Sequence, residues 1–200
     1  TGDFVLSDVY LSVLEAIKHA AWNANRKPVI EWLNAEEYEK NPKSVSELKK
    51  YDGIIIPGGF GSRGIEGKIR AIQFVRENKI PYFGLCYGMQ CAVIEFARNV
   101  LGLKNANTIE INTKTPHPVI HFMSGQDKNI QEKKMGGTLR LGSYPCVLKK
   151  GSVAQTAYKS TEISERHRHR YEFNNAYRAE LESAGLVVSG ESPDGMLAEI

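Results

Sequence analysis

The chain contains three cysteines, and one of them stands where a nucleophile would be placed. Cys86 lies between Gly84 and Gly88 in a G-x-C-x-G pattern, after a short apolar run and before a helical pattern. This arrangement is typical of a nucleophile elbow, a sharp strand-to-helix turn that exposes its central side chain. The helix N-terminus would favour a thiolate over a thiol. The pattern predicts a cysteine nucleophile; the alternative is a buried core cysteine, which is our interpretation of Cys91 and Cys146.

A glycine-rich loop, Pro57-Gly58-Gly59-Phe60-Gly61, follows another short apolar run. Glycines let backbone N–H groups approach a ligand closely. In a parallel sheet this loop can lie beside the cysteine turn, so one of its N–H groups and that of Tyr87 would form an oxyanion hole. A phosphate cradle is the alternative, although the loop lacks the Gly-Lys-Ser/Thr ending of a P-loop.

The elements that would position these residues alternate between strands and helices in the first half of the chain. Short buried runs predict strands at 53–57 and 81–85, and apolar residues at helical spacing predict helices at 8–21, 65–78 and 89–100. Such alternation predicts a parallel α/β sheet with its active site at the carboxyl ends of the strands. The second half predicts a strand at 118–120, a loop at 124–134, an antiparallel pair at 138–148, a strand at 164–173, a helix at 176–184 and a hairpin joining 186–188 to 196–200.

Length and composition describe one large globular domain or two small ones. The chain has 200 residues, 42% of them hydrophobic, and a net charge of +3, so charge gives no reason to expect a nucleic-acid partner. We expect no membrane partner, because no apolar run approaches the roughly 20 residues of a membrane span, and we find no signal peptide. Three widely spaced cysteines fit neither a disulfide framework nor a zinc site, so we expect no metal and a reducing, cytoplasmic location.

Two motifs, the glycine-rich loop and Gly84-Leu85-Cys86-Tyr87-Gly88-Met89-Gln90, resemble the class I, or triad, glutamine amidotransferases. Segments 63–68 and 136–142 resemble the CTP synthase family within that class, and so above all does the run Glu165-Arg166-His167-Arg168-His169-Arg170-Tyr171-Glu172-Phe173-Asn174. The similarity covers nearly the whole chain. It implies the class I glutaminase (flavodoxin-like) α/β fold, in which helices flank a mostly parallel sheet and an antiparallel segment is added.

The resemblance also implies roles for individual residues. Cys86 would be the nucleophile, with oxyanion donors from Gly59 and Tyr87. Glu110 would bind the α-ammonium group of glutamine and Arg170 would face its α-carboxylate, because a zwitterion needs one anion and one cation. The alternatives are a solvated carboxylate at Glu110 and a basic surface patch for RNA or phosphate at Arg166–Arg170. The glutamine pocket would be lined by Gly59, Tyr87, Gly88, Met89, Gln90, Glu110 and Arg170.

The activity that the resemblance implies is hydrolysis of glutamine through a cysteine thioester. The ammonia would pass to an amidoligase domain that converts UTP to CTP with ATP and magnesium, in an enzyme that forms a homo-oligomer, a tetramer. No cofactor is expected in the glutaminase domain itself. The alternatives are another triad amidotransferase, a hydrolase of γ-glutamyl amides, or a catalytically incomplete domain that binds glutamine or regulates.

The chain departs from this family at its ends. Family members carry the triad histidine and glutamate in a His-Pro-Glu segment, which does not occur among residues 1–200. We therefore expect a single glutamine amidotransferase domain, 1–200, that is trimmed at both ends, lacks the amidoligase domain and is a poor glutaminase alone. We expect structural roles for His167 and His169. His169 adjoins Arg170, but consecutive side chains of a strand point to opposite faces, which argues against His169 as the base.

Overall fold

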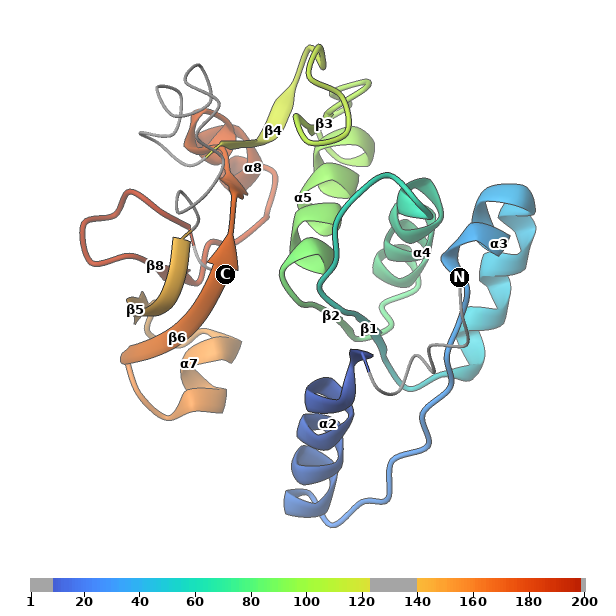
Figure 1. The fold of residues 1–200 in the computed structure, drawn as a ribbon, viewed down its shortest axis with the longest axis vertical. Helices are drawn as coiled ribbons and strands as arrows, with labels where there is room; N and C mark the ends of the chain where they lie inside the picture. The colour runs from blue at the N-terminus through green and yellow to red at the C-terminus, as the bar shows by residue number, and fades with distance from the viewer. Residues whose placement is uncertain (1–8, 123–139, 199–200) are drawn as a thin grey trace.

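The computed structural model describes residues 9–122 and 140–198, which are drawn as a ribbon in Figure 1. The α-helices are α2 (Leu11–Asn23), α3 (Ala35–Lys40), α4 (Ile65–Glu77), α5 (Tyr87–Asn99), α7 (Val153–Tyr158) and α8 (Arg178–Ser183), with 3-10 helices η1 (Pro42–Lys50) and η2 (Asn175–Tyr177). The strands are β1 (Ile54–Ile56), β2 (Tyr82–Gly84), β3 (Asn107–Thr108), β4 (Pro118–Phe122), β5 (Arg140–Leu148), β6 (Glu162–His169), β7 (Tyr171–Phe173) and β8 (Gly190–Glu191). No helix in the two described ranges is long and apolar enough to cross a bilayer.

The first half has the alternating strands and helices that the sequence predicts. β1 and β2 pair in parallel, α4 connects them, and α5 follows β2 after a short turn. Ile56 at the end of β1 packs in the main core with Ile69 and Ile72 of α4 and Ile94 of α5, all of them buried. The two helices therefore fix the carboxyl ends of both strands, where the glycine-rich loop and the cysteine turn begin. The predicted α/β fold class is confirmed.

The second half is built around an antiparallel ladder. β5 pairs with β6 from Arg140↔His169 to Val147↔Glu162, and β8 pairs with the other edge of β5. A separate sheet has the order β3-β4-β7, in which β4 is parallel to β3 and antiparallel to β7. Because β6 and β7 are consecutive in the chain but belong to different sheets, the residue between them, Arg170, lies at a break in the strand.

Three predictions in this half are wrong in part. The antiparallel pair expected at 138–148 is one strand, β5, because its ladder partner is β6. The strand expected at 164–173 is divided into β6 and β7. The final hairpin turns at the expected residues, 193–195, but its first arm is β8, where Glu191 bridges to Ala198, rather than 186–188. The loop expected at 124–134 lies outside the described residues.

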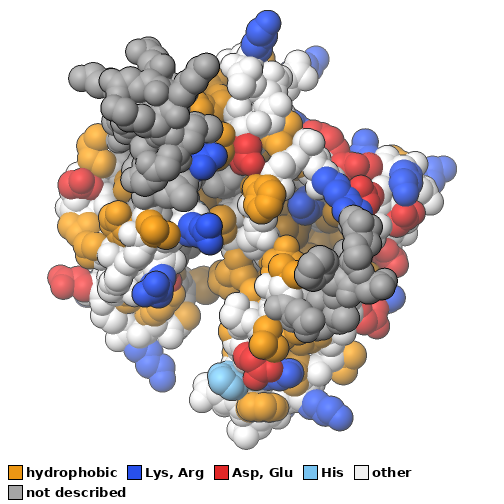
Figure 2. All heavy atoms as spheres, viewed as in Figure 1, with side chains coloured by type: hydrophobic (Ala, Val, Ile, Leu, Met, Phe, Trp, Pro, Cys, Tyr) orange, Lys and Arg blue, Asp and Glu red, His pale blue; other side chains and the backbone are white. Residues whose placement is uncertain are grey.

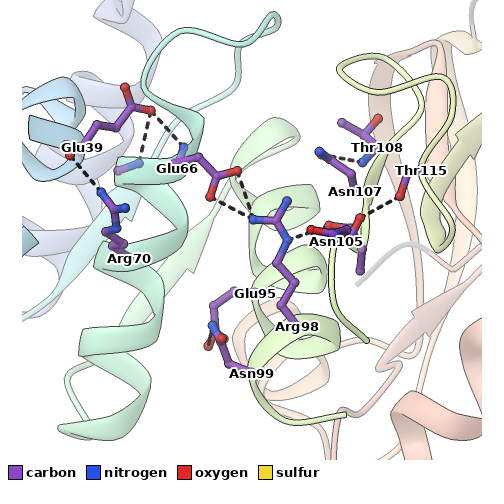
Figure 3. A network of polar contacts seen from close by, with 12 residues as sticks. Glu39, Glu66, Arg70, Glu95, Arg98, Asn99, Asn105, Asn107, Thr108 and Thr115 are labelled. Carbon is purple, nitrogen blue, oxygen red and sulfur yellow. Dashed lines mark hydrogen bonds and ion pairs between the residues drawn. The ribbon is translucent and has the colours of Figure 1, made fainter. Parts of the chain in front are cut away.

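Polar contacts fasten α3, α4 and α5 to one another (Figure 3). Glu66 of α4 accepts from Nη1 of Arg98 on α5 at 2.9 Å, and its backbone N–H donates to the carboxylate of Glu39 on α3 at 3.0 Å. Nε of Arg98 donates to the carbonyl of Ala106, 2.6 Å away, just before β3. Arg98 therefore links α5, whose first turn adjoins the cysteine, both to α4 and to the segment that leads to Glu110.

A second ion pair between α4 and α5 is largely buried. Nε and Nη2 of Arg76 donate to the two carboxylate oxygens of Glu95 at 2.9 and 2.7 Å, and Asn99 donates to the same carboxylate at 3.1 Å. The side chain of Glu95 is 1% exposed and that of Arg76 is 34% exposed. Such donors offset the loss of hydration that burial imposes on a carboxylate.

One face of the parallel pair is only partly covered. Ile55 and Phe83, opposite each other in β1 and β2, are 39% and 59% exposed. α2 lies apart from the main body of the fold (Figure 1) and buries none of its residues. Figure 2 shows a notch between α2 and the half that contains β5 and β6, with hydrophobic side chains on its walls.

Substitution of Arg76 by alanine should lower the free energy of unfolding by roughly 3 kcal/mol, because it leaves the Glu95 carboxylate buried without its main partner. Denaturant unfolding of the parent and variant measures the difference. The matched control is Arg63→Ala, which breaks an ion pair with Glu36 whose arginine is 74% exposed and should destabilise the fold much less, because solvent screens an exposed pair. Equal losses in the two variants would contradict the role assigned to the buried pair.

Candidate active site

The turn between β2 and α5 has the geometry of a nucleophile elbow. Cys86 has φ 53° and ψ −103°, a backbone conformation that residues other than glycine rarely adopt. A Cβ on Gly84 would lie 2.6 Å from the backbone of Gly88, and a Cβ on Gly88 would lie 2.2 Å from the carbonyl oxygen of Ile56. The two glycines of the motif are therefore required by close packing of β1, β2 and α5.

The three thiols differ in their access to solvent. Cys86 is half-buried, whereas Cys91 on α5 and Cys146 on β5 are fully buried. Burial is the main cause that raises the pKa of Cys91 to about 12. The interpretation of these two cysteines as packing residues is consistent with their burial, and Cys86 is left as the thiol that a substrate could reach.

The glycine-rich loop lies against the cysteine turn, as the sequence predicts. A Cβ on Gly58 would lie 3.5 Å from Cβ and 4.0 Å from Sγ of Cys86, and a Cβ on Gly59 would lie 3.8 Å from Cδ1 of Tyr87. The hydroxyl of Tyr87 donates to the carbonyl of Gly61. Burial, with smaller effects of Cys91 and Glu110, raises the pKa of Tyr87 far above its usual range, so this donor keeps its proton. The loop and the helix N-terminus thus form two sides of one site.

Glu110 lies at the same site, although it follows β3 in the other half of the chain. Its Oε1 accepts from the backbone N–H of Gly61 at 2.9 Å. The side chain is half-buried, which distinguishes it from the freely solvated carboxylate considered as an alternative. The carboxylate of Glu110 could accept further hydrogen bonds, because an ionised carboxylate has about four acceptor positions.

The start of β7 closes another side of the site. Nε2 of Gln90, in the first turn of α5, donates to the carbonyl of Tyr171 at 3.0 Å. The pKa of Tyr171 is raised by burial and then by the charge of Glu110, and the guanidinium of Arg170 acts against both. Glu110 and Arg170, which are far apart in sequence, therefore both act on one tyrosine. Met89 packs partly buried against the main core.

His169 lies close to the cysteine, which the sequence does not predict, and the structural role expected for it stays a prediction. Its ring makes a side-chain contact with Cys86, and its Nδ1 lies 3.5 Å from Oε1 of Glu172. Burial lowers the pKa of His169, but the hydrogen bond to Cys86 and the carboxylate of Glu172 outweigh burial and raise the pKa to about 10. The structure thus brings a thiol, an imidazole and a carboxylate together.

The sequence argument about the direction of the His169 side chain assumed one continuous strand. Consecutive side chains alternate only while a strand remains regular, and β6 ends at His169 while β7 begins at Tyr171. With the ladder interrupted at Arg170, His169 and Arg170 need not point to opposite faces. The only sequence signal for this contact was the spacing of His169 and Glu172, which are three residues apart. That spacing indicates a contact only once the interruption between β6 and β7 is known.

Comparisons with known proteins agree with this geometry. The model of the class I glutamine amidotransferase family matches residues 5–200. The chain is 61% identical to the CTP synthase of Caldanaerobacter subterraneus subsp. tengcongensis, with 100% of this chain and 36% of that protein covered, and 58% identical to that of Fibrobacter succinogenes, with 98% and 34% covered. The chain thus spans about a third of the length of the curated relatives it matches.

A solved structure is also similar to this chain. The glutaminase domain of Trypanosoma brucei CTPS with bound acivicin is 38% identical and superposes with a TM-score of 0.87, covering 99% of this chain and 75% of that one. Both the family match and this structural match extend over almost every residue, including the elbow, the glycine-rich loop and the β6–β7 segment. The chain belongs to the class I glutamine amidotransferase family.

Proposed function

We propose that this chain is the glutaminase part of a CTP synthase and releases ammonia from the side-chain amide of glutamine. The observation that carries the proposal is the elbow at Cys86, an accessible thiol between a glycine-rich loop and a helix N-terminus. The similar trypanosomal domain binds acivicin, which supports a ligand site in the same fold.

The reaction would proceed through a covalent thioester. The Cys86 thiolate attacks the amide carbon, and the N–H groups of Gly59 and Tyr87 donate to the oxyanion that forms. Collapse of this intermediate breaks the carbon–nitrogen bond, and the departing nitrogen takes a proton to leave as ammonia. Water then hydrolyses the thioester, which returns the thiol and yields glutamate. The positions of Gly58 and Gly59 against the elbow support this arrangement.

The same site would recognise the amino-acid end of glutamine. We assign the α-ammonium group to Glu110 and the α-carboxylate to Arg170, with Gly88, Met89 and Gln90 lining the pocket in the first turn of α5. Opposite charges at a fixed separation select a zwitterion over a simple amide. The support is that Glu110 and Arg170 both lie near Tyr171, where they shift its pKa in opposite directions, and that the backbone N–H of Gly61 anchors Glu110.

The ammonia would be used by an amidoligase domain of the same enzyme to convert UTP to CTP with ATP and magnesium. We assign no residue of this chain to the binding of UTP, ATP or magnesium. The greater length of the matched CTP synthases supports such a partner domain. We further propose a homo-oligomer, a tetramer, for the complete enzyme. A cytoplasmic location is proposed because the reaction needs Cys86 as a free thiol, which a reducing compartment preserves.

An electrophilic glutamine analogue, such as a chloroketone, should label Cys86 in preference to the other two cysteines. The physical reason is that Cys91 is 0% and Cys146 is 1% exposed, whereas Cys86 is accessible. Peptide mapping by mass spectrometry locates the label, and excess glutamine should protect the site. Label found mainly on Cys91 or Cys146 would remove the nucleophile from the proposal.

Substitutions Glu110→Ala and Arg170→Ala should reduce glutamine-dependent CTP formation by the complete enzyme far more than ammonia-dependent formation. Loss of one partner of a charged contact costs about 2 kcal/mol or more, so kcat/KM for glutamine should fall at least roughly 30-fold. Arg166→Ala is the matched control, because Arg166 is an exposed arginine of the same segment. Equal losses with the two nitrogen sources would indicate a folding defect and count against the assignment.

A further inference from the structure

The glycine-rich loop carries Gly59, the proposed oxyanion donor, but a glycine backbone prefers no single direction for its N–H group. We propose that two tyrosine hydroxyls, those of Tyr10 and Tyr87, hold the two ends of this loop, and that Tyr10 thereby directs the Gly59 N–H toward the oxyanion. Tyr10 is then a positioning residue, which acts on the reaction through the backbone of the loop. The inference deepens the proposed glutaminase reaction and rests on it for its meaning.

The hydrogen bond at the first end of the loop acts on the peptide unit that contains the oxyanion donor. The hydroxyl of Tyr10 donates to the carbonyl oxygen of Gly58, 3.1 Å away. That carbonyl and the N–H of Gly59 belong to one peptide unit, which is planar and trans, so the two groups point in opposite directions. A partner that fixes the direction of the Gly58 oxygen therefore also fixes the direction of the Gly59 hydrogen.

Gly61, at the second end of the loop, is held by both of its backbone polar groups. Its carbonyl accepts from the hydroxyl of Tyr87, and its N–H donates to Oε1 of Glu110 at 2.9 Å. The ring of Tyr87 is fixed in turn, because the residue is 2% exposed and Nζ of Lys68 lies 5.1 Å over the ring. These partners restrain a residue whose own backbone, with φ 80°, is free to adopt other conformations.

Side-chain packing does little to hold the loop between these ends. Phe60, the aromatic residue of the loop, is 87% exposed. Among the described residues, a Cβ placed on Gly61 would have no neighbour within 4 Å. A segment with so few packing contacts opens easily unless hydrogen bonds restrain it. The hydroxyls of Tyr10 and Tyr87 and the carboxylate of Glu110 provide such bonds.

The start of α2 places Tyr10 at the loop. The carbonyl of Tyr10 accepts from the backbone N–H groups of Val13 and Leu14 at 2.9 and 3.0 Å, and its ring centroid lies 5.7 Å from that of Trp32. Because α2 buries none of its residues, the alternative is that the hydroxyl only fastens this helix to the rest of the fold. The two roles predict different results, because fastening affects stability whereas the direction of the Gly59 N–H affects the chemical step.

The first test is the effect of Tyr10→Phe on the kinetics of the complete enzyme. The substitution removes one oxygen atom and keeps the ring beside Trp32. The Gly59 N–H meets a negative oxygen only after the thiolate has attacked, so its direction matters more in the transition state than in bound glutamine. With glutamine, kcat should fall roughly tenfold, a smaller loss than that of a whole oxyanion donor, and KM should stay within about twofold. Ammonia-dependent CTP formation should not change.

Tyr51→Phe is the matched control for this substitution. Tyr51 is half-buried like Tyr10, and its hydroxyl donates to Glu31, which adjoins Trp32, rather than to the loop. This variant should keep the kcat and KM of the parent. A kcat for Tyr10→Phe equal to that of the parent would overturn the inference, and so would an equal loss with ammonia or a rise in KM alone.

The second end of the loop gives an independent variant, which also covers the case in which Tyr10→Phe does not fold. Tyr87→Phe removes the hydroxyl that donates to Gly61 and should lower kcat for glutamine with little change in KM. Its control is Tyr38→Phe, because Tyr38 is 3% exposed and its hydroxyl donates to Glu47. Equal kinetic constants for Tyr87→Phe and Tyr38→Phe would overturn the restraint at this end.

Hydrogen exchange of the complete enzyme, followed by mass spectrometry, tests the restraint without any reaction. Peptides that contain residues 57–61 should exchange roughly fivefold faster in Tyr10→Phe than in Tyr51→Phe, because the loop opens more easily after the loss of one hydrogen bond. Equal exchange in the two variants would overturn the inference even where the parent uses glutamine. Faster exchange in Tyr10→Phe, together with a parent that releases no ammonia from glutamine, would remove the proposed function and leave the loop restraint standing.

Discussion

The turn at Cys86, with its positive φ, is the constraint on which the rest of the site depends. A non-glycine residue in such a conformation typically costs about 1–3 kcal/mol, and here the surrounding packing holds it. Gly84 and Gly88 let β2 and α5 approach β1 more closely than any side chain would permit. With the turn fixed, the thiol faces the glycine-rich loop on one side and the β6–β7 break on the other. The core of α4 and α5 thus determines where the chemistry can occur.

The part of this arrangement that is local in sequence could be predicted from sequence. The motif around Cys86 and the glycine-rich loop each combine a short apolar run with glycines, and parallel pairing is the usual result of alternating strands and helices. The position of Glu110 came only from the family resemblance, since no periodicity places a carboxylate after β3 beside a loop 49 residues earlier. Tertiary packing decides whether two residues so far apart in the sequence come together.

Irregular backbone was the second feature that limited prediction of the site from the sequence. The argument against His169 as the base used a rule that is correct for a continuous strand. The strand is interrupted at Arg170, because β6 and β7 belong to different sheets. The buried pair of Arg76 and Glu95 escaped prediction for a related reason. Both residues lie in helices that read as ordinary amphipathic segments, and nothing in the spacing shows that a carboxylate faces inward.

The deep burial of Cys91 and Cys146 has a consequence for the redox chemistry of the domain. A cysteine that peroxide converts to a sulfenic acid is usually rescued when a nearby thiol condenses with it to a disulfide. Here both remaining cysteines are enclosed in the packed interior, so the described residues offer Cys86 no accessible second thiol. Further oxidation to the sulfinic acid would be irreversible. Recovery of an oxidised domain would therefore depend on small thiols that can enter the site from solution.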